Sequence, residues 1–122
     1  MSDPRHQLGR EGEQLALDHL ERLGYALIAR NHRTRFGELD LIVCGGGALV
    51  FVEVKTRRAT RPGRPWENLH AVKRAQVRRM AAAFLAEVPE RPRADELRFD
   101  AVGVTIDPRG RLVALEHLEG AF

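Results

Sequence analysis

The sequence predicts an α/β sandwich with a mixed β-sheet, in the order α-β-β-β-α-β-β. Apolar residues recur at helical spacing in two long segments, and five shorter segments have the pattern of strands. The chain has 122 residues, 43% of them hydrophobic, which is enough for a real core. We therefore expect one compact domain that spans residues 1–122.

The first helix is expected to begin near Ser2-Asp3-Pro4, where a capping side chain precedes a proline in the first turn. Gly24 ends it, as glycine commonly does. A short strand is then expected over residues 25–30, followed by a polar connection over residues 31–36. The apolar stripe of this helix consists of Leu8, Gly12, Leu15, Ala16, Leu20 and Leu23.

A hairpin comes next. Residues 37–43 and 50–55 alternate apolar and polar side chains with period two, which is typical of half-buried strands. Gly46-Gly47 between them suits a two-residue turn of the primed type, which needs positive φ. This turn sets the register in which the two strands face each other.

In this register Asp40 lies opposite Glu53, and Glu38 lies opposite Lys55. Cross-strand partners have Cβ atoms about 4.5–5.5 Å apart. Two carboxylates that close repel each other unless a cation lies between them or one takes up a proton. Mg²⁺ prefers carboxylate oxygens, so the hairpin is predicted to form half of a metal site.

Lys55 lies two residues after Glu53 on the same strand face. It could reach an attacking water or the charge that develops on a phosphorane. The alternative is a surface lysine that pairs with Glu38.

Glu13 is a third acid that could belong with the hairpin. It lies three and seven residues before Ala16 and Leu20, on the core-facing side of the first helix. A buried carboxylate is costly unless it is paired or bound to a metal. The alternative is an acid near the helix start that the helix dipole favours.

The second half of the chain completes the sandwich. Residues 57–65 are rich in Pro, Gly and Arg and are expected to form a loop. A helix is expected from about residue 66 to Glu87, followed by strands over residues 97–106 and 112–118. The apolar stripe of this helix consists of Leu69, Val72, Val77, Met80, Ala81, Phe84 and Leu85.

Positive charge is concentrated after the second hairpin strand, although the net charge is only +3. Residues 57–79 contain one acid, Glu67, and eight basic residues. Clustered basic charge beside an acidic pair indicates a phosphate-backbone partner, and the alternative is a solvated loop and helix face. The basic residues expected to contact nucleic acid are Arg57, Arg58, Arg61, Arg64, Lys73, Arg74 and Arg78.

The sequence contains no apolar run long enough to span a bilayer and no signal-peptide pattern after Met1. Its one cysteine, Cys44, cannot form a disulfide within the chain and is interpreted as a packing residue. We therefore expect a cytoplasmic protein with no membrane partner.

Through Asp40 and the triplet Glu53-Val54-Lys55, the sequence resembles the PD-(D/E)xK nuclease superfamily. More closely, it resembles the YraN-like uncharacterised protein family of bacteria. This resemblance covers nearly the whole chain. The matching segments are residues 9–13 with Ala16 and Leu20, residues 24–25, Asn31, Arg33, residues 37–42, residues 50–57 and residues 98–102.

The resemblance implies a restriction-endonuclease-like fold, in which helices flank a mixed sheet and the site lies on a hairpin. Archaeal Holliday junction resolvases of this superfamily carry a helix acid that matches Glu13, which supports a third metal ligand. The implied catalytic residues are Asp40, Glu53 and Lys55. Glu13, Asp40 and Glu53 are the implied ligands of Mg²⁺ or Mn²⁺.

Two other features are ambiguous. Some branches of the superfamily carry a Gln-x-x-x-Tyr motif on the helix after the lysine, but here Gln76 is followed by Met80, so the motif is incomplete and its role is not carried over to Gln76. Arg98 and Asp100 form a charged pair on one strand face, which either braces the sheet or contacts substrate.

The leading hypothesis is a metal-dependent endonuclease that hydrolyses phosphodiester bonds of DNA, including branched or processed DNA. A homodimer would suit the cutting of a four-way junction. One alternative is a catalytically inactive nucleic-acid-binding module on a nuclease fold. Another is a structural partner in a larger complex, with its acids in internal salt bridges.

Overall fold

The computed structural model of the protein describes residues 4–59 and 71–122. Its helices and strands follow one another in the predicted order α-β-β-β-α-β-β, which is therefore confirmed. They are α1 (Pro4–Arg22), β1 (Ala26–Thr34), β2 (Gly37–Gly45), β3 (Ala48–Arg58), α2 (Ala71–Glu87), β4 (Glu96–Ile106) and β5 (Leu112–Leu118).

The five strands form one sheet in the order β1-β2-β3-β4-β5. β3 and β4 are parallel, and the other neighbouring pairs are antiparallel, so the sheet is mixed as predicted. A parallel pair needs a crossover, and the connection between β3 and β4 contains α2. This arrangement is consistent with the restriction-endonuclease-like class that the resemblance implied.

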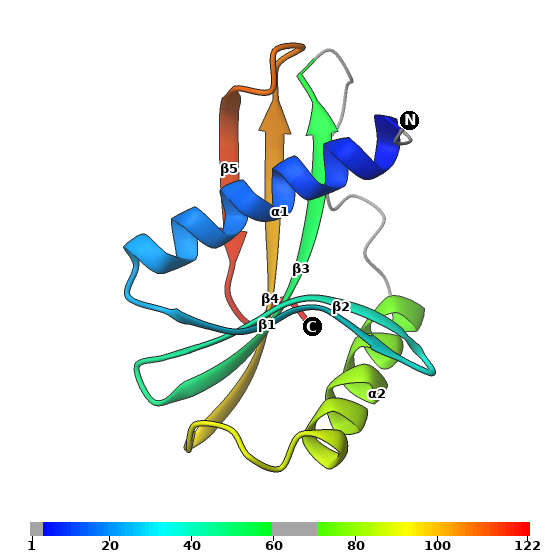
Figure 1. The fold of residues 1–122 in the computed structure, drawn as a ribbon, viewed down its shortest axis with the longest axis vertical. Helices are drawn as coiled ribbons and strands as arrows, with labels where there is room; N and C mark the ends of the chain where they lie inside the picture. The colour runs from blue at the N-terminus through cyan, green and yellow to red at the C-terminus, as the bar shows by residue number, and fades with distance from the viewer. Residues whose placement is uncertain (1–3, 60–70) are drawn as a thin grey trace.

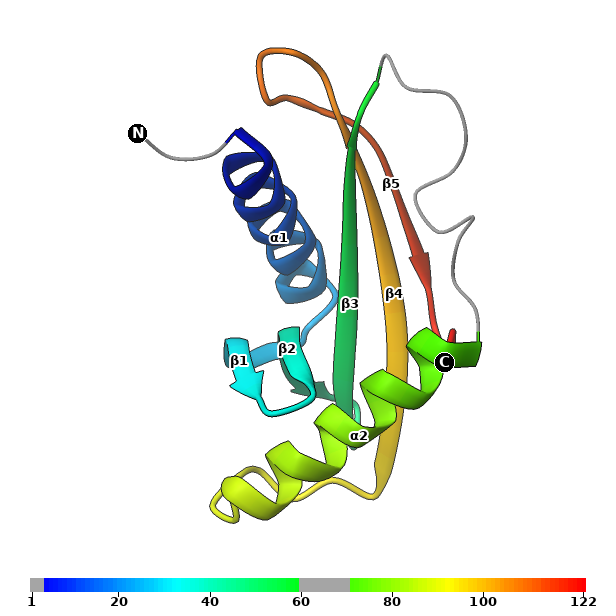
Figure 2. The ribbon, with the colours of Figure 1, turned by 90° about the vertical axis from the view of Figure 1, so that its right-hand side faces the viewer.

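Each helix packs on its own hydrophobic core. α1 buries Ala16, Leu17 and Leu20 against Val50 and Val52 of β3. α2 packs on the neighbouring side chains Leu49 and Phe51, which point to the other face of the strand because side chains alternate. α1 lies beside the upper part of the sheet in Figures 1 and 2, and α2 lies across the lower part.

The hairpin has the predicted turn, and the predicted register is confirmed from Gly45 and Ala48 to Leu41 and Val52. The predicted cross-strand partners Asp40 and Glu53 lie beyond the last backbone pair. Gly46 and Gly47 adopt φ angles of 58° and 81°, and the pairing continues from Gly45 and Ala48 inward. It ends at Leu41 and Val52, beyond which β2 remains paired with β1 alone. At this fork β1 and β2 turn away and run across the direction of β3 and β4 (Figure 1).

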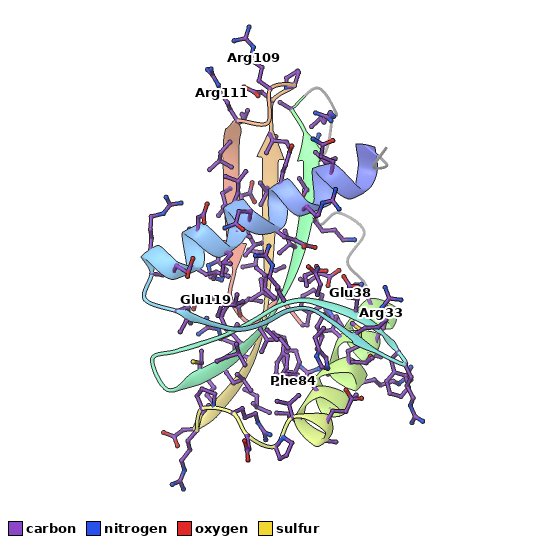
Figure 3. The ribbon with its side chains drawn as sticks, viewed as in Figure 1. Arg33, Glu38, Phe84, Arg109, Arg111 and Glu119 are labelled. Atoms are coloured by element: carbon purple, nitrogen blue, oxygen red, sulfur yellow. The ribbon has the colours of Figure 1, made fainter. Side chains whose placement is uncertain are left out.

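The divergence of the strands overturns one predicted contact. Glu38 does not face Lys55, because β2 has already left β3 at that point. Glu38 pairs instead with Arg33 of β1, and their side chains form an ion pair of 3.5 Å. Both residues lie on the part of the β1–β2 ribbon that projects beyond the sheet (Figure 3).

The bounds near β1 also differ from the prediction. The polar connection expected over residues 31–36 was wrong, because β1 continues to Thr34 through backbone pairing with β2. Leu23 was expected in the core, but it is 57% exposed because α1 ends before it at Arg22. The expected start of the second helix near residue 66 lies outside the described residues.

α1 crosses β3 at Gly12, where the two elements approach closely. A Cβ atom added to Gly12 would lie 2.6 Å from the Cβ atom of Thr56, closer than two such atoms can approach. Glycine is therefore required here by the close approach, and the next residue is Glu13. In the same helix, a Cβ atom added to Gly9 would meet no atom within 4 Å.

This contrast gives a matched pair of variants. Gly12→Ala should lower the free energy of unfolding by about 1–3 kcal/mol, because it overpacks the contact with Thr56. Gly9→Ala should raise it by about 0.5–1 kcal/mol, because alanine favours a helix more than glycine does. Urea denaturation followed by circular dichroism measures both, and equal stabilisation by the two variants would contradict the close approach.

Candidate functional site

Asp40 and Glu53 lie at the fork. The Val54 N–H, on the stretch of β3 beyond the last backbone pair with β2, donates a hydrogen bond of 2.8 Å to Asp40 Oδ2. Glu53 is the residue before Val54 and is buried, with 7% of its surface exposed. The Glu53 carboxylate lies close enough to Asp40 for its negative charge to raise the pKa of Asp40.

This environment changes how Asp40 ionises. Burial, then the negative charge of Glu53, raises the pKa of Asp40 to about 8, although the hydrogen bond from Val54 opposes the shift. The charge of Glu13 adds to it. The Asp40 carboxyl therefore ionises less readily than a free aspartate, and a cation beside it would favour its charged form.

Glu13 approaches the same site from α1. Its Oε1 accepts a hydrogen bond of 2.9 Å from Asn31 Nδ2, and the same amide nitrogen donates to Glu38 Oε1 over 3.1 Å. Burial raises the pKa of Glu13, Asn31 lowers it, and the charges of Glu38 and Glu53 raise it further. Asn31 thus links the two acids Glu13 and Glu38 near the site. Asn31 was expected in a polar connection, and this role was not predicted from the sequence.

Asn31 can do this because of an unusual backbone. Its φ is 50°, a left-handed conformation that asparagine tolerates better than most residues. The adjacent strand β2 carries Glu38 into reach of the Asn31 side chain.

Lys73 also belongs to this site, although the sequence predicted it as a phosphate contact. Its Nζ lies 3.0 Å from Glu53 Oε1, and the two side chains are 26% and 8% exposed. Lys73 comes from α2, twenty residues after Glu53 in the chain. The packing of α2 therefore brings the Lys73 ammonium to Glu53. The alternation of residues in the strands could not predict this contact.

The position of α2 is set partly by Gln76. Its Nε2 donates a hydrogen bond of 2.8 Å to the Phe36 carbonyl oxygen, in the turn between β1 and β2. Gln76 thus joins α2 to the β1–β2 ribbon that carries Asp40, a structural contact that the incomplete family motif did not predict.

The remaining predicted residues lie around this centre. Lys55 is exposed on β3, and Arg57 and Arg58 near the strand end are partly buried. Arg74 is exposed on α2. Arg78 is exposed as well, but its guanidinium donates to the Phe122 carbonyl and lies 4.7 Å from the centre of the Phe99 ring. Arg61 and Arg64 lie outside the described residues.

The donor set suits a hard cation. Within residues 4–59 and 71–122, no three His, Cys, Asp or Glu side chains are close enough to hold a metal ion together. Mg²⁺ in proteins is commonly held by one or two carboxylates, with water and substrate phosphate as its other ligands. The pair Asp40 and Glu53 fits that pattern, and a ligand role for Glu13 stays a prediction.

A second polar network surrounds the fully buried Asp100, which pairs with Val52 of β3. Its carboxylate accepts two hydrogen bonds of 2.9 Å from Arg98, one of 2.8 Å from His117 and one of 3.0 Å from the Gly120 N–H. Burial alone would raise the pKa of Asp100, but His117, Arg98 and Gly120 hold it at about 2. This network joins β4 to β5 and the C-terminal segment, which favours the bracing role for Arg98 and Asp100.

Comparison with known proteins places the chain among its relatives. The model of the uncharacterised protein family UPF0102 matches residues 12–104. The chain belongs to this family. The matched range of the UPF0102 model includes Glu13, Asp40, Glu53, Lys55 and Lys73.

Several UPF0102 proteins are similar along nearly their whole length. One of Frankia alni is 50% identical over 115 residues, which are 94% of this chain and 93% of the relative. One of Pelotomaculum thermopropionicum is 41% identical over all of both chains. One of Symbiobacterium thermophilum is 48% identical over 106 residues, 87% of this chain and 88% of the relative.

Neither α1 nor the described part of α2 is both long enough and apolar enough to cross a bilayer.

The acid pair predicts a pH dependence of stability. The pKa of Asp40 is raised in the folded state, so the folded protein binds more protons than the unfolded chain between about pH 4 and pH 8. The contribution of Asp40 to stability therefore falls as pH rises through this window. In chelator, Asp40→Asn should be more stable than the wild type by about 1–3 kcal/mol at pH 8, and this advantage should shrink toward pH 5.

Urea denaturation at several pH values measures this difference. Glu11→Gln changes an acid on α1 that is hydrogen-bonded to Gln7, and it should follow the wild-type curve. An Asp40→Asn advantage that stays constant from pH 5 to pH 8 would exclude the raised pKa as its cause.

Proposed function

We propose that the protein is a metal-dependent nuclease that hydrolyses phosphodiester bonds of DNA. One observation carries this proposal: the half-buried Asp40 lies beside the buried Glu53 at the fork, where burial and the charge of Glu53 raise the pKa of Asp40. A divalent cation bound between the two carboxylates would relieve the repulsion between their charges. Such a pair is therefore better explained by cation binding than by stability.

Mg²⁺ or Mn²⁺, when bound, would stabilise negative charge on the scissile phosphate and acidify an attacking water. Asp40 and Glu53 would hold the cation, and the Val54 N–H orients Asp40 for this role. Glu13, with its carboxylate oriented by Asn31, would be a third ligand. Lys55 is exposed two residues beyond Glu53 and would contact the water or the phosphorane charge.

The basic residues around the site support a nucleic-acid substrate. Arg57 and Arg58 continue β3 past Lys55, and Arg74 follows Lys73 on α2. Arginine contacts to phosphate would position the backbone without reading its sequence. Branched or processed DNA is the proposed substrate class, and a homodimer would present two such sites to the strands of a junction.

A second candidate is a nucleic-acid-binding module without catalysis. The ion pair between Lys73 and Glu53 favours it, because the ammonium neutralises one carboxylate without any metal. This candidate keeps salt-sensitive DNA binding, and it requires that Mn²⁺ neither bind to the acid pair nor raise the melting temperature.

The test offers linear, nicked, flapped and four-way-junction DNA to purified protein with Mg²⁺ or Mn²⁺. Asp40→Asn and Glu53→Gln should each reduce cleavage at least about 100-fold, because each removes a ligand oxygen from the site. Glu13→Gln should also reduce cleavage, whereas its helix neighbour Glu11→Gln should cleave as the wild type does.

Cleavage that is equal in the wild type and the double variant Asp40→Asn/Glu53→Gln would assign the activity to a contaminant. DNA binding without cleavage, together with no Mn²⁺ binding by calorimetry, would favour the non-catalytic module.

A further inference from the structure

We propose that Lys73 competes with the metal for Glu53: its ammonium occupies the carboxylate in the metal-free protein and leaves when a divalent cation binds to Asp40 and Glu53. This inference rests on the proposed function, because it assigns a regulatory element to the same site. It makes α2 a participant in metal loading, where the sequence predicted only a phosphate contact.

The contact between Lys73 and Glu53 is specific. Lys73 Nζ lies 3.0 Å from Oε1, a distance at which the ammonium donates a charge-assisted hydrogen bond. Glu53 is 8% exposed as a side chain, so water can compete only weakly for it. Removing one partner of a buried ion pair is more costly than removing one partner of an exposed pair, because it leaves an uncompensated buried charge. The Glu53 carboxylate therefore needs a cationic partner when no metal is present.

The Lys73 ammonium and a divalent metal ion compete for the Glu53 carboxylate, because both carry positive charge and both bind to its oxygens. Mg²⁺ lies about 2.0–2.1 Å from its ligand oxygens and requires a nearly octahedral shell. An ammonium hydrogen-bonded to the same oxygen would occupy that shell and repel the cation. Entry of the metal therefore requires Lys73 to move.

The fold permits that movement without a shift of the helix. Gln76, three residues later, ties α2 to the β1–β2 turn, and Val77 and Met80 are buried in the core. The backbone of α2 is held there, whereas lysine has a long, flexible stem. A change of side-chain rotamer is sufficient to withdraw the ammonium from Glu53 and to leave it beside the site, where a substrate phosphate would arrive.

The composition of the chain allows a direct test. The chain has only two lysines, Lys55 and Lys73, and Lys55 is exposed. Wild-type protein is labelled with an amine-reactive reagent, and mass spectrometry follows each lysine with and without MnCl₂. Without metal, Lys73 should react about fivefold more slowly than Lys55, and saturating Mn²⁺ should remove most of that difference.

Two variants control the experiment. Glu53→Gln removes the partner of Lys73, so Lys73 should react rapidly whether or not Mn²⁺ is present. Lys73→Met keeps a similar length without the charge, and calorimetry should show that it binds Mn²⁺ about fivefold more tightly than the wild type. Circular dichroism confirms that both variants are folded before they are compared.

The outcomes separate this inference from the proposed function. Protection of Lys73 that persists while Mn²⁺ is bound, or no gain of affinity in Lys73→Met, overturns the competition and leaves the nuclease proposal intact. Metal-dependent release of Lys73 without DNA cleavage supports the competition and overturns the nuclease. If Lys73→Met binds Mn²⁺ and the wild type does not, the result supports a lysine that blocks the site. If neither the wild type nor Lys73→Met binds Mn²⁺, both proposals are overturned.

Discussion

The arrangement of this molecule depends on the point where β2 leaves β3. Backbone pairing stops at Leu41 and Val52, and Asp40 Oδ2 then accepts the Val54 N–H on the next stretch of β3. The carboxylate thereby stabilises the end of the ladder and is held against Glu53. One hydrogen bond therefore connects the termination of a strand pair with the assembly of a chemical site.

α1 and α2 pack on different hydrophobic cores, and each contributes a side chain to the region of the fork. Gly12 allows α1 to approach β3 closely, which brings the next residue, Glu13, near the acids. Gln76 ties α2 to the β1–β2 turn, and Lys73 reaches Glu53 from the preceding helical turn. An open fork has room for such side chains, whereas a continuous sheet would have filled the space with paired backbone.

Stability and chemistry are separated within the sheet. Asp100 is fully buried, yet its carboxylate accepts four hydrogen bonds, two of them from Arg98, so it braces β4 and β5. The Asp40 and Glu53 pair has fewer donors and carries like charges, so burial raises the pKa of Asp40 instead of being compensated. The contrast shows that Asp100 serves the fold, and it supports the proposal that Asp40 and Glu53 bind a cation.

The element order and the Gly46-Gly47 turn could be predicted from the amino-acid sequence, because periodicity and turn chemistry act between neighbouring residues. The turn also brings Asp40 near Glu53, although both residues lie beyond the last backbone pair of the hairpin. The sequence patterns predicted the wrong partner for Glu38 and did not indicate the contacts of Asn31 with Glu13 and Glu38. The alternation of apolar and polar residues does not reveal where β2 stops pairing with β3. The ion pair between Lys73 and Glu53 and the hydrogen bond that joins α2 to the β1–β2 turn through Gln76 could be found only from the folded arrangement. Those contacts depend on how helices pack on the sheet, which is set by the whole core and by no single segment.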